Sequence, residues 1–318
     1  MRIEGVDIEA VFGGIPANVV DNLASLTELV GAEKAASIVK ATGFEVRRVA
    51  IEGSDVFDLA LPAAKRALEG TDPSQIAGVI AVSFSNRDRF PALATRLQHA
   101  LGLSTDTVAY DISMACSGWV YGLFAAAQLV KATGKKVLLV DGDVQSAWTD
   151  CSDPNTLAVM GDGASATLLA PGEGVWDFAF YTDGSGADAL RCRETISMDG
   201  FGVFRFVAGP VRKFLASFMQ SSELLVGIGP IFVPHQANMY MVRQLSESLG
   251  LRDRTFGSGA RYANTGSSSA ALTMADGLGS ILADRGRATV LIAGFGAGLS
   301  AAAVATTIGI YRNGVVEI

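Results

Sequence analysis

Short apolar runs of strand length alternate along this chain with longer runs of helical periodicity, and this alternation constrains the fold more than any other feature. The runs IAGVIAVSFS (76–85), KVLLVDGDV (136–144) and ATVLIAGFG (288–296) are almost continuously apolar. Strands of parallel sheets have this pattern because helices cover both of their faces. The alternation therefore predicts a layered α/β fold with buried sheets. Further strands are expected at 107–113, 163–170 and 230–235, and helices at 90–102, 119–134, 239–250 and 267–286.

The composition argues against several classes of protein. Of the 318 residues, 49% are hydrophobic and 18% charged, and no apolar run reaches membrane-spanning length. The first residues, MRIEGVDIEA, carry acidic side chains rather than a signal-peptide pattern. A net charge of −7 argues against a nucleic-acid-binding surface. Three dispersed cysteines form neither a disulfide framework nor a metal-binding motif, so we expect a cytoplasmic enzyme without a metal site.

A weak internal repeat indicates two similar halves. VLLVDGD followed by GDGASATLLA in the first half is similar to VLIAGFGAGLSAAAVATTIG in the second. Two pseudo-symmetric α/β halves, residues 1–170 and 171–318, would explain the similarity. The alternative is that such glycine-rich segments recur wherever two strands pack tightly, and the repeat alone does not decide between the two.

Cys116 lies between a predicted strand and a predicted helix, in the sequence AYDISMACSGWVYG. The surrounding small residues allow a tight turn, which would place the thiol over the helix N-terminus. Free N–H groups and the helix dipole at that position favour a thiolate. The alternative is that a free cysteine packs as a small buried hydrophobe. We expect that structural role for Cys151 and Cys192.

Two polar residues of the second half also follow strands or turns. His235 comes directly after the apolar run PIFVP and before a helical segment, and catalytic groups of open α/β sheets collect at such strand ends. Asn264 lies in the glycine- and serine-rich segment RYANTGSSSA. A structural histidine and a helix N-cap are the ordinary interpretations of these two residues. The pattern nevertheless predicts that Cys116, His235 and Asn264 converge between the two halves.

Six motifs extend this pattern: DISMACSGW, MGDGASATLLA, MDGFGVFRF, VPHQANMY, RYANTGSSSA and GFGAGLS. In this order they resemble the β-ketoacyl-acyl-carrier-protein synthase III family of the thiolase-like superfamily. The similarity runs from about residue 76 to the C-terminus, and HQAN after a strand is a specific signal. The resemblance implies a thiolase-like, five-layered αβαβα fold built from two pseudo-symmetric halves.

The resemblance also implies an enzyme mechanism. Cys116 would accept an acyl group from a thioester of coenzyme A or acyl carrier protein. A malonyl thioester would then lose carbon dioxide and attack the acyl-cysteine to give a 3-oxoacyl product. His235 and Asn264 would donate hydrogen bonds to the enolate oxygen, and the backbone N–H groups of Cys116 and Ala297 would form an oxyanion hole. No cofactor is implied.

Partner-binding residues are implied as well. Family members form twofold dimers through the strand that precedes the nucleophile, here 107–113, and Phe90 matches a position that reaches the partner's acyl pocket. An ordinary buried aromatic is the alternative for Phe90. Arg205 keeps a position that meets the acidic carrier protein, and Arg243 lies one turn beyond the usual basic position, which is Tyr240 here.

The chain departs from the family pattern where the adenine of coenzyme A would bind. Ser37 and Ala41 stand where a tryptophan and an arginine are expected, and CSDPNTLAV before MGDG has no basic residue. The sequence therefore favours acyl carrier protein as the donor, in fatty-acid or specialised lipid or polyketide biosynthesis. Two alternatives stay open: an acyltransferase that does not decarboxylate, and a non-catalytic partner subunit of a ketosynthase heterodimer.

Overall fold

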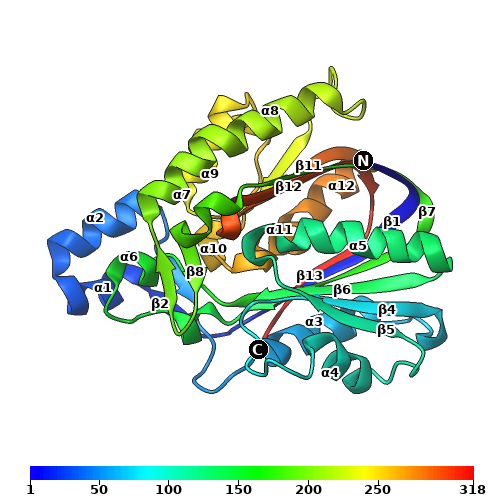
Figure 1. Ribbon diagram of the computed structural model, residues 1–318, viewed down its shortest axis with the longest axis horizontal. Coiled ribbons are helices and arrows are strands. Elements are labelled where there is room, and N and C mark those ends of the chain that lie inside the picture. Colours follow the sequence, from blue (N-terminus) through cyan, green and yellow to red (C-terminus); the bar gives the residue numbers. More distant parts are fainter.

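Nine strands are joined by hydrogen bonds in the computed structural model, which describes residues 1–318 (Figure 1). Their order is β10-β11-β12-β7-β6-β4-β5, and β1 pairs with both β7 and β13. The strands are β1 (Arg2–Ile15), β4 (Ile76–Val82), β5 (Val108–Ile112), β6 (Lys136–Asp143), β7 (Gly163–Thr182), β10 (Ile231–Pro234), β11 (Arg287–Gly296), β12 (Ser300–Gly309) and β13 (Arg312–Glu317). Two small hairpins are separate: β2 (Val19–Asp21) with β3 (Val46–Arg48), and β8 (Leu190–Cys192) with β9 (Ile196–Met198).

Twelve α-helices accompany these strands. They are α1 (Asn22–Val30), α2 (Ala32–Thr42), α3 (Val56–Leu68), α4 (Leu93–Ala100), α5 (Gly118–Thr133), α6 (Pro154–Leu157), α7 (Gly200–Phe206), α8 (Arg212–Ser221), α9 (Met239–Ser248), α10 (Gly259–Tyr262), α11 (Ser269–Thr273) and α12 (Gly279–Arg285). None of them combines the length and the apolar character that crossing a lipid bilayer requires.

Strand β7 connects the two halves of the molecule. Its first part, Gly163–Leu169, pairs with β6, and its second part, Trp176–Thr182, pairs with β12. Strand β1 follows it antiparallel along nearly its whole length. The sequence predicted only 163–170 of this strand, so the proposed division after residue 170 falls inside β7. The two half-sheets are therefore continuous through their shared strands.

Three hydrophobic cores separate the layers. One lies between α3 and α4 and the first half-sheet, and another lies between α8 and α9 and the second half-sheet. The largest core lies between the two half-sheets, around α5, α11 and α12. Strand β11 shows the alternation: Val290 and Ile292 belong to the central core, and Leu291 belongs to an outer one. The result is the predicted five-layered αβαβα arrangement (Figure 1).

The helical run predicted at 267–286 is helical over almost its whole length, but its hydrogen-bond pattern changes along it. Between α11 and α12 the chain makes a π-helical turn, Met274–Leu278. The Tyr311 hydroxyl donates to the carbonyl of Met274 at 2.9 Å, and Asn313 Nδ2 donates to the carbonyl of Ala275 at 2.9 Å. These side chains satisfy carbonyls that a π-turn releases from the α-helical pattern. The sequence does not indicate these bonds, because Tyr311 and Asn313 lie more than 30 residues further along the chain, just before β13 and at its start.

Candidate active site

Cys116 lies on a tight turn between β5 and α5. The turn is a 3₁₀ helix over Ala115–Ser117, and Ala115 has a positive φ of 43°, which L residues other than glycine rarely adopt. Two glycines of β11 let this turn approach the sheet. A Cβ at Gly294 would lie 2.8 Å from the Cα of Ser117, and one at Gly296 would lie 3.2 Å from the Cys116 sulfur. The turn and β11 therefore hold the sulfur in one position.

The surroundings of the sulfur correct one expectation from the sequence. Backbone groups of Cys116 and Ala297 hydrogen-bond the sulfur and favour its ionised form. Burial outweighs them, and the carboxylate of Asp143 acts in the same direction as burial, so the pKa of the thiol is raised to about 12. The predicted preference for a thiolate at the helix N-terminus is therefore wrong, because a thiol with this pKa is protonated at neutral pH.

His235 follows the carboxyl end of β10, as the sequence predicted, and its side chain is buried. Its Nδ1 lies 2.7 Å from the Ser269 hydroxyl, which also accepts from the Gln236 backbone N–H at 3.1 Å. Burial lowers the pKa of His235 to about 3. The imidazole is therefore neutral at physiological pH, and it has one N–H to donate.

Asn264 is held by the first half of the molecule. Its backbone N–H donates to the Val159 carbonyl at 3.1 Å, and its carbonyl accepts from Gly161 N–H at 2.9 Å and from Gln145 Nε2 at 2.6 Å. Its side-chain oxygen accepts from the Gly266 N–H at 2.9 Å. The oxygen is thus occupied within its own turn, while Nδ2 donates one proton to the Ala237 carbonyl at 3.5 Å and keeps a second proton to donate. The hydrogen bond from Gly266 comes from the first residue of the 3₁₀ turn Gly266–Ser268 and is of the capping kind, so Asn264 also has the local structural role that the alternative interpretation gives it.

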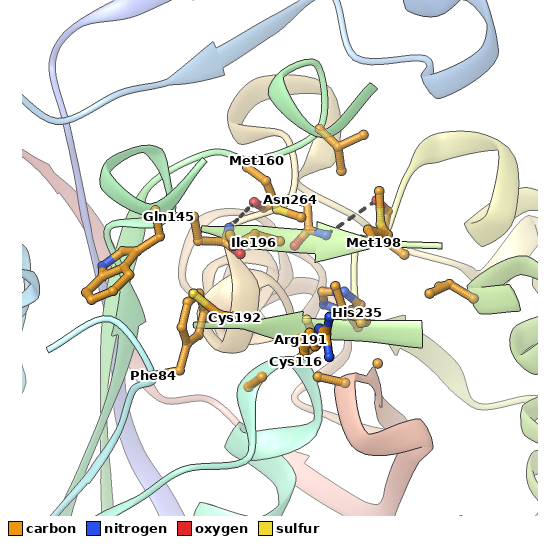
Figure 2. Close-up of a pocket in the computed structure, with 18 of the residues that line it drawn as sticks. Phe84, Cys116, Gln145, Met160, Arg191, Cys192, Ile196, Met198, His235 and Asn264 are labelled. Atoms are coloured by element: carbon orange, nitrogen blue, oxygen red, sulfur yellow. Dashed lines mark hydrogen bonds between the residues drawn. The ribbon is translucent and has the colours of Figure 1, made fainter. Parts of the chain in front are cut away.

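These three residues line one cavity of about 950 Å³ (Figure 2). Cys116 comes from the first half and His235 and Asn264 from the second, so the cavity lies where the halves meet. The backbone turn with Ala297 also lines it. The predicted convergence of Cys116, His235 and Asn264 is therefore observed, with Ala297 beside them, while their catalytic roles are a matter for the proposal below.

Several residues of the site were not identified from the sequence. Asp143 ends β6 and is buried, and it accepts hydrogen bonds from Ser83 and Ser267. Burial raises its pKa to about 6. Gln145 donates to the Gly161 and Asn264 carbonyls and so joins the halves. Their position at the end of a predicted strand (Asp143) and directly after it (Gln145) was the only available signal.

The other cysteines do not behave as predicted. Cys151 is exposed, because it lies in the turn before α6, and it is not part of a hydrophobic core. Cys192 is only partly buried, and it lies on β8, where it lines the same cavity as Cys116 (Figure 2). The expectation that both pack as small buried hydrophobes is therefore wrong.

The predicted partner-binding residues lie on the surface of the chain. Phe90 is 87% exposed, so the interpretation of an ordinary buried aromatic is wrong. Arg205 on α7 and Arg243 on α9 are both exposed, and each guanidinium lies over an aromatic ring of its own helix. The rings of Phe204 and Tyr240 are 6.3 Å apart and link the two helices. Arg205 and Arg243 thus belong to one continuous surface.

Ser37 and Ala41 lie on α2 and line the cavity. They are exposed, and Asn155 of α6 lines the cavity as well. None of these three side chains stacks or carries a positive charge. The structure therefore places the residues that replace the expected tryptophan and arginine within the cavity wall.

The thiol of Cys116 lies on a constrained turn beside backbone N–H donors. His235 and Asn264 line the same cavity and offer two neutral side-chain donors. This arrangement suits covalent acyl transfer. Together with the five-layered fold, it defines a condensing acyltransferase of the thiolase-like class. Comparisons with known proteins agree. Two family models match, 3-oxoacyl-[acyl-carrier-protein] synthase III over residues 110–184 and its C-terminal domain over residues 230–308.

The chain is 34% identical over 273 residues to a β-ketoacyl-[acyl-carrier-protein] synthase III of Geobacillus kaustophilus, covering 83% of this chain and 87% of the relative. A 3-oxoacyl-(acyl-carrier-protein) synthase of Burkholderia xenovorans superposes with a TM-score of 0.94 at 27% identity, covering 100% and 98% of the two chains. A priming β-ketosynthase of a polyketide biosynthetic pathway superposes with a TM-score of 0.85 at 27% sequence identity. The superposition covers 96% of this chain and 97% of that one. The chain belongs to the β-ketoacyl-acyl-carrier-protein synthase III family, and it is an acyltransferase enzyme.

Proposed function

We propose that the protein catalyses decarboxylative condensation of a Cys116-bound acyl group with a malonyl thioester, giving a 3-oxoacyl thioester. The observation that carries this proposal is the convergence of Cys116, His235 and Asn264 on one cavity. The solved relatives include a 3-oxoacyl-(acyl-carrier-protein) synthase and a priming ketosynthase of a polyketide pathway, which supports a reaction of fatty-acid or polyketide biosynthesis. The enzyme needs no cofactor in this scheme, because thioesters supply the activated carbon.

The first half-reaction transfers the acyl group to Cys116. The sulfur attacks the donor carbonyl, the donor C–S bond breaks, and the proton of the thiol leaves with the departing carrier thiol. This exchange creates no net charge, so a thiol with a raised pKa is compatible with it. The N–H groups of Cys116 and Ala297 are the donors proposed to hold the tetrahedral oxyanion.

The second half-reaction removes carbon dioxide from a malonyl thioester. The electrons of the broken C–C bond form an enolate, which attacks the acyl-cysteine carbonyl and releases the sulfur. The neutral N–H of His235 and the Nδ2 of Asn264 are proposed to stabilise the enolate oxygen. Loss of one such donor typically costs about 2.7–4 kcal/mol of transition-state stabilisation.

Intact-mass and decarboxylation assays test the proposal together. Wild-type protein should gain the mass of one acyl group from an acyl thioester, and it should release carbon dioxide from malonyl thioester. Cys116→Ser should lose the covalent adduct, while Cys151→Ser and Cys192→Ser should keep it. His235→Ala and Asn264→Ala should still be acylated but should lose carbon dioxide release by about a hundredfold or more each.

The outcomes separate the alternatives. An adduct that survives in Cys116→Ser would refute the nucleophile assignment. Acylation without any decarboxylation, with transfer to an amine or alcohol, would indicate a non-decarboxylating acyltransferase instead. A wild-type protein that acquires activity only when mixed with a homologue would indicate a subunit of a heterodimer. Retention of both Cys116 and His235 argues against that last possibility.

The donor is proposed to be an acyl carrier protein. Ser37 and Ala41 provide no stacking ring and no cation for an adenine nucleotide. Arg205 and Arg243, joined through the contact of Phe204 with Tyr240, offer an exposed positive surface on α7 and α9. This surface suits an acidic carrier protein.

The working form is proposed to be a cytoplasmic homodimer. Strand β5 is at the edge of the sheet, and Val108 and Tyr110 are 42% and 38% exposed there. An exposed apolar edge strand is a natural place for pairing with a second copy. Three residues after the exposed Phe90, the Leu93 N–H donates to the carboxylate of Asp111 on β5, so Phe90 belongs to a segment anchored at this edge. The three free cysteines support a reducing compartment.

A further inference from the structure

A buried carboxylate, that of Asp143, lies close to the cavity without lining it, and neither proposed half-reaction uses it. Asp143 ends β6, and its side chain is fully buried. No lysine, arginine or histidine forms an ion pair with it. A buried charge without a counter-ion is unfavourable unless hydrogen bonds compensate for it, so the partners of this carboxylate indicate what it does.

Four hydrogen-bond donors from two distant segments converge on this carboxylate. Oδ1 accepts from the Ser83 hydroxyl and from the Phe84 N–H, both at 3.0 Å. Oδ2 accepts from the hydroxyl and from the N–H of Ser267, at 3.1 and 3.4 Å. Ser83 and Phe84 follow β4 in the first half, while Ser267 belongs to the 3₁₀ turn Gly266–Ser268 of the second half. The carboxylate therefore joins the two halves of the molecule beside the site.

The partners of Asp143 require a carboxylate rather than an amide. A backbone N–H can only donate, and one such group faces each oxygen, that of Phe84 at Oδ1 and that of Ser267 at Oδ2. An asparagine could accept only one of these two hydrogen bonds, because its NH₂ group would face the other donor. Burial raises the pKa of Asp143 to about 6, so the group is still mostly ionised above pH 7.

The turn that Asp143 holds contacts both of the proposed enolate donors. The Gly266 N–H donates to Oδ1 of Asn264 at 2.9 Å, and the backbone of Gly266 also hydrogen-bonds the imidazole of His235 (Figure 2). Gly266 has a positive φ of 63°, and a Cβ there would lie 2.6 Å from Oδ2 of Asp143. The turn thus fits closely between the carboxylate and the two side chains, and a shift of the turn would move both donors.

We propose that Asp143 is a positioning residue for the decarboxylation step. It holds the turn Gly266–Ser268, and this turn orients the side chains of His235 and Asn264 toward the enolate oxygen. Donors stabilise a transition state only where they are correctly placed, and a misplacement of about 1 Å can slow a reaction about a hundredfold. Asp143 does not contact the reacting atoms, and acylation of Cys116 does not require it. The inference rests on the proposed function, since it concerns the removal of carbon dioxide.

Asp143→Asn tests this role through three rates. Protein acylated beforehand with butanoyl-pantetheine should release carbon dioxide from malonyl-acyl carrier protein about tenfold or more slowly than wild type. The acylation itself, followed by intact mass, should not fall by more than about twofold, whereas a damaged site would lose it. The Asp143 charge opposes ionisation of the Cys116 thiol, so the iodoacetamide rate at pH 8.5 should rise about threefold or more in a Cys151→Ser/Cys192→Ser background.

Ser267→Ala tests the same link while the charge stays in place. It should slow carbon dioxide release about threefold or more and leave the acylation and iodoacetamide rates near wild type. Ser222→Ala is the matched control, because Ser222 is also buried and its hydroxyl donates to a carboxylate, that of Asp177, at 2.7 Å. Neither Ser222 nor Asp177 lines the cavity, so this variant should change none of the three rates.

The outcomes separate this inference from the proposed function and from folding. Wild-type carbon dioxide release in Asp143→Asn and in Ser267→Ala would overturn the inference. An equal loss of acylation and carbon dioxide release in both variants would also overturn it, because Asp143 would then support the site as a whole. If Asp143→Asn does not fold, the result for Ser267→Ala decides. A wild-type protein that is acylated but releases no carbon dioxide would overturn the proposed function, and this inference with it.

Discussion

At the scale of single residues, burial moves the proton affinities of Cys116 and His235 in opposite directions. It raises the pKa of the thiol to about 12 and lowers the pKa of the imidazole to about 3. Both groups are therefore uncharged over the whole neutral range. An uncharged pair needs no compensating ion inside the cavity, and it leaves both residues as hydrogen-bonding groups for the reacting thioesters.

The raised pKa of Cys116 predicts a pH dependence for its alkylation. In a Cys151→Ser/Cys192→Ser background only Cys116 reacts, and only its thiolate is nucleophilic. Because the thiolate fraction grows tenfold per pH unit below the pKa, the iodoacetamide rate should rise about tenfold per unit from pH 7 to 9.5 without levelling off. Quenched mass spectrometry measures the rate at each pH.

His235 provides the internal check on that experiment. Its pKa of about 3 lies below the range, so the profile should show no step near pH 6.5. A plateau below pH 9 would instead mean that the helix N-terminus and the N–H groups of Cys116 and Ala297 overcome the effect of burial. The same profile measured with His235→Ala should keep its slope.

At the scale of elements, the close approach of β11 to the nucleophile turn depends on glycine. A Cβ at Gly294 would lie 2.8 Å from the Cα of Ser117 and 2.9 Å from the carbonyl oxygen of Cys116, and neither backbone atom can move alone. Gly294→Ala should therefore destabilise the protein by about 1–3 kcal/mol, and it should slow acylation of Cys116 by displacing the turn. Urea unfolding and intact mass measure the two effects.

Gly277→Ala is the matched control for this substitution. Gly277 lies in the π-helical turn, and a Cβ there would have no neighbour within 4 Å. The control should keep both the acylation rate and the free energy of unfolding, or gain slightly from the reduced entropy of the unfolded chain. Wild-type acylation in Gly294→Ala would show that the turn and β11 are not coupled as described.

The elements also show what a sequence can and cannot predict. Strands β4, β6 and β11 were predicted to within a few residues because their apolar runs are continuous. No element was assigned to the first 75 residues, and β1 was missed. Its first residues alternate between apolar and charged types, and its partners β7 and β13 lie more than a hundred residues away. Such pairing leaves no local signal.

The residues of the candidate site also fall into those that a local sequence feature indicates and those that depend on contacts between distant segments. Cys116 and His235 were found because each stands at a strand end, which is a local feature. Gln145 and Ser269 were not found, since their importance comes from hydrogen bonds to Asn264 and His235 in other segments. The pKa of Cys116 was predicted in the wrong direction, because a sequence shows the helix that follows but not the depth of burial.

At the scale of the whole molecule, the edge strand β5 predicts the state of association. Pairing of β5 with its copy would join two sheets and cover Val108, Tyr110 and Phe90. An obligate interface of this kind buries on the order of 2,000 Å² or more. Light scattering at low micromolar concentration should give about twice the chain mass of 33.0 kDa. Tyr110→Lys should shift the protein toward monomer, because a charge on an edge strand opposes pairing.

A surface substitution remote from β5 controls for general effects of added charge. Ser280→Lys on α12 should leave the mass at that of the dimer. A wild-type protein that is monomeric and fully active would refute both the interface and the role of Phe90 at the partner's cavity. Loss of activity only in the monomeric variant would support a cavity that is completed by the second copy.

The identity of the donor carrier is also a property of the whole molecule, because it depends on where charge lies on an acidic surface. With the same acyl group, acylation of Cys116 should be faster from acyl carrier protein than from coenzyme A, since Ser37 and Ala41 offer nothing to an adenine. Stacking and charge-assisted contacts contribute roughly 1–3 kcal/mol each where they are present. Initial rates of adduct formation with the two donors measure the preference.

Measuring the acylation rate at several salt concentrations separates the effect of the Arg205 and Arg243 surface from the effect of the cavity. If Arg205 and Arg243 attract the carrier, its reaction should slow as ionic strength rises from about 0.01 to 0.15 M, because the Debye length falls from about 30 to 8 Å. Arg205→Glu/Arg243→Glu should slow the carrier reaction and flatten its salt dependence, while the coenzyme A reaction should change little. Arg252→Glu, on the turn after α9, is the matched charge reversal and should leave both reactions near wild type. A salt-insensitive preference for coenzyme A would contradict the proposed donor and would place an adenine site elsewhere on the cavity rim.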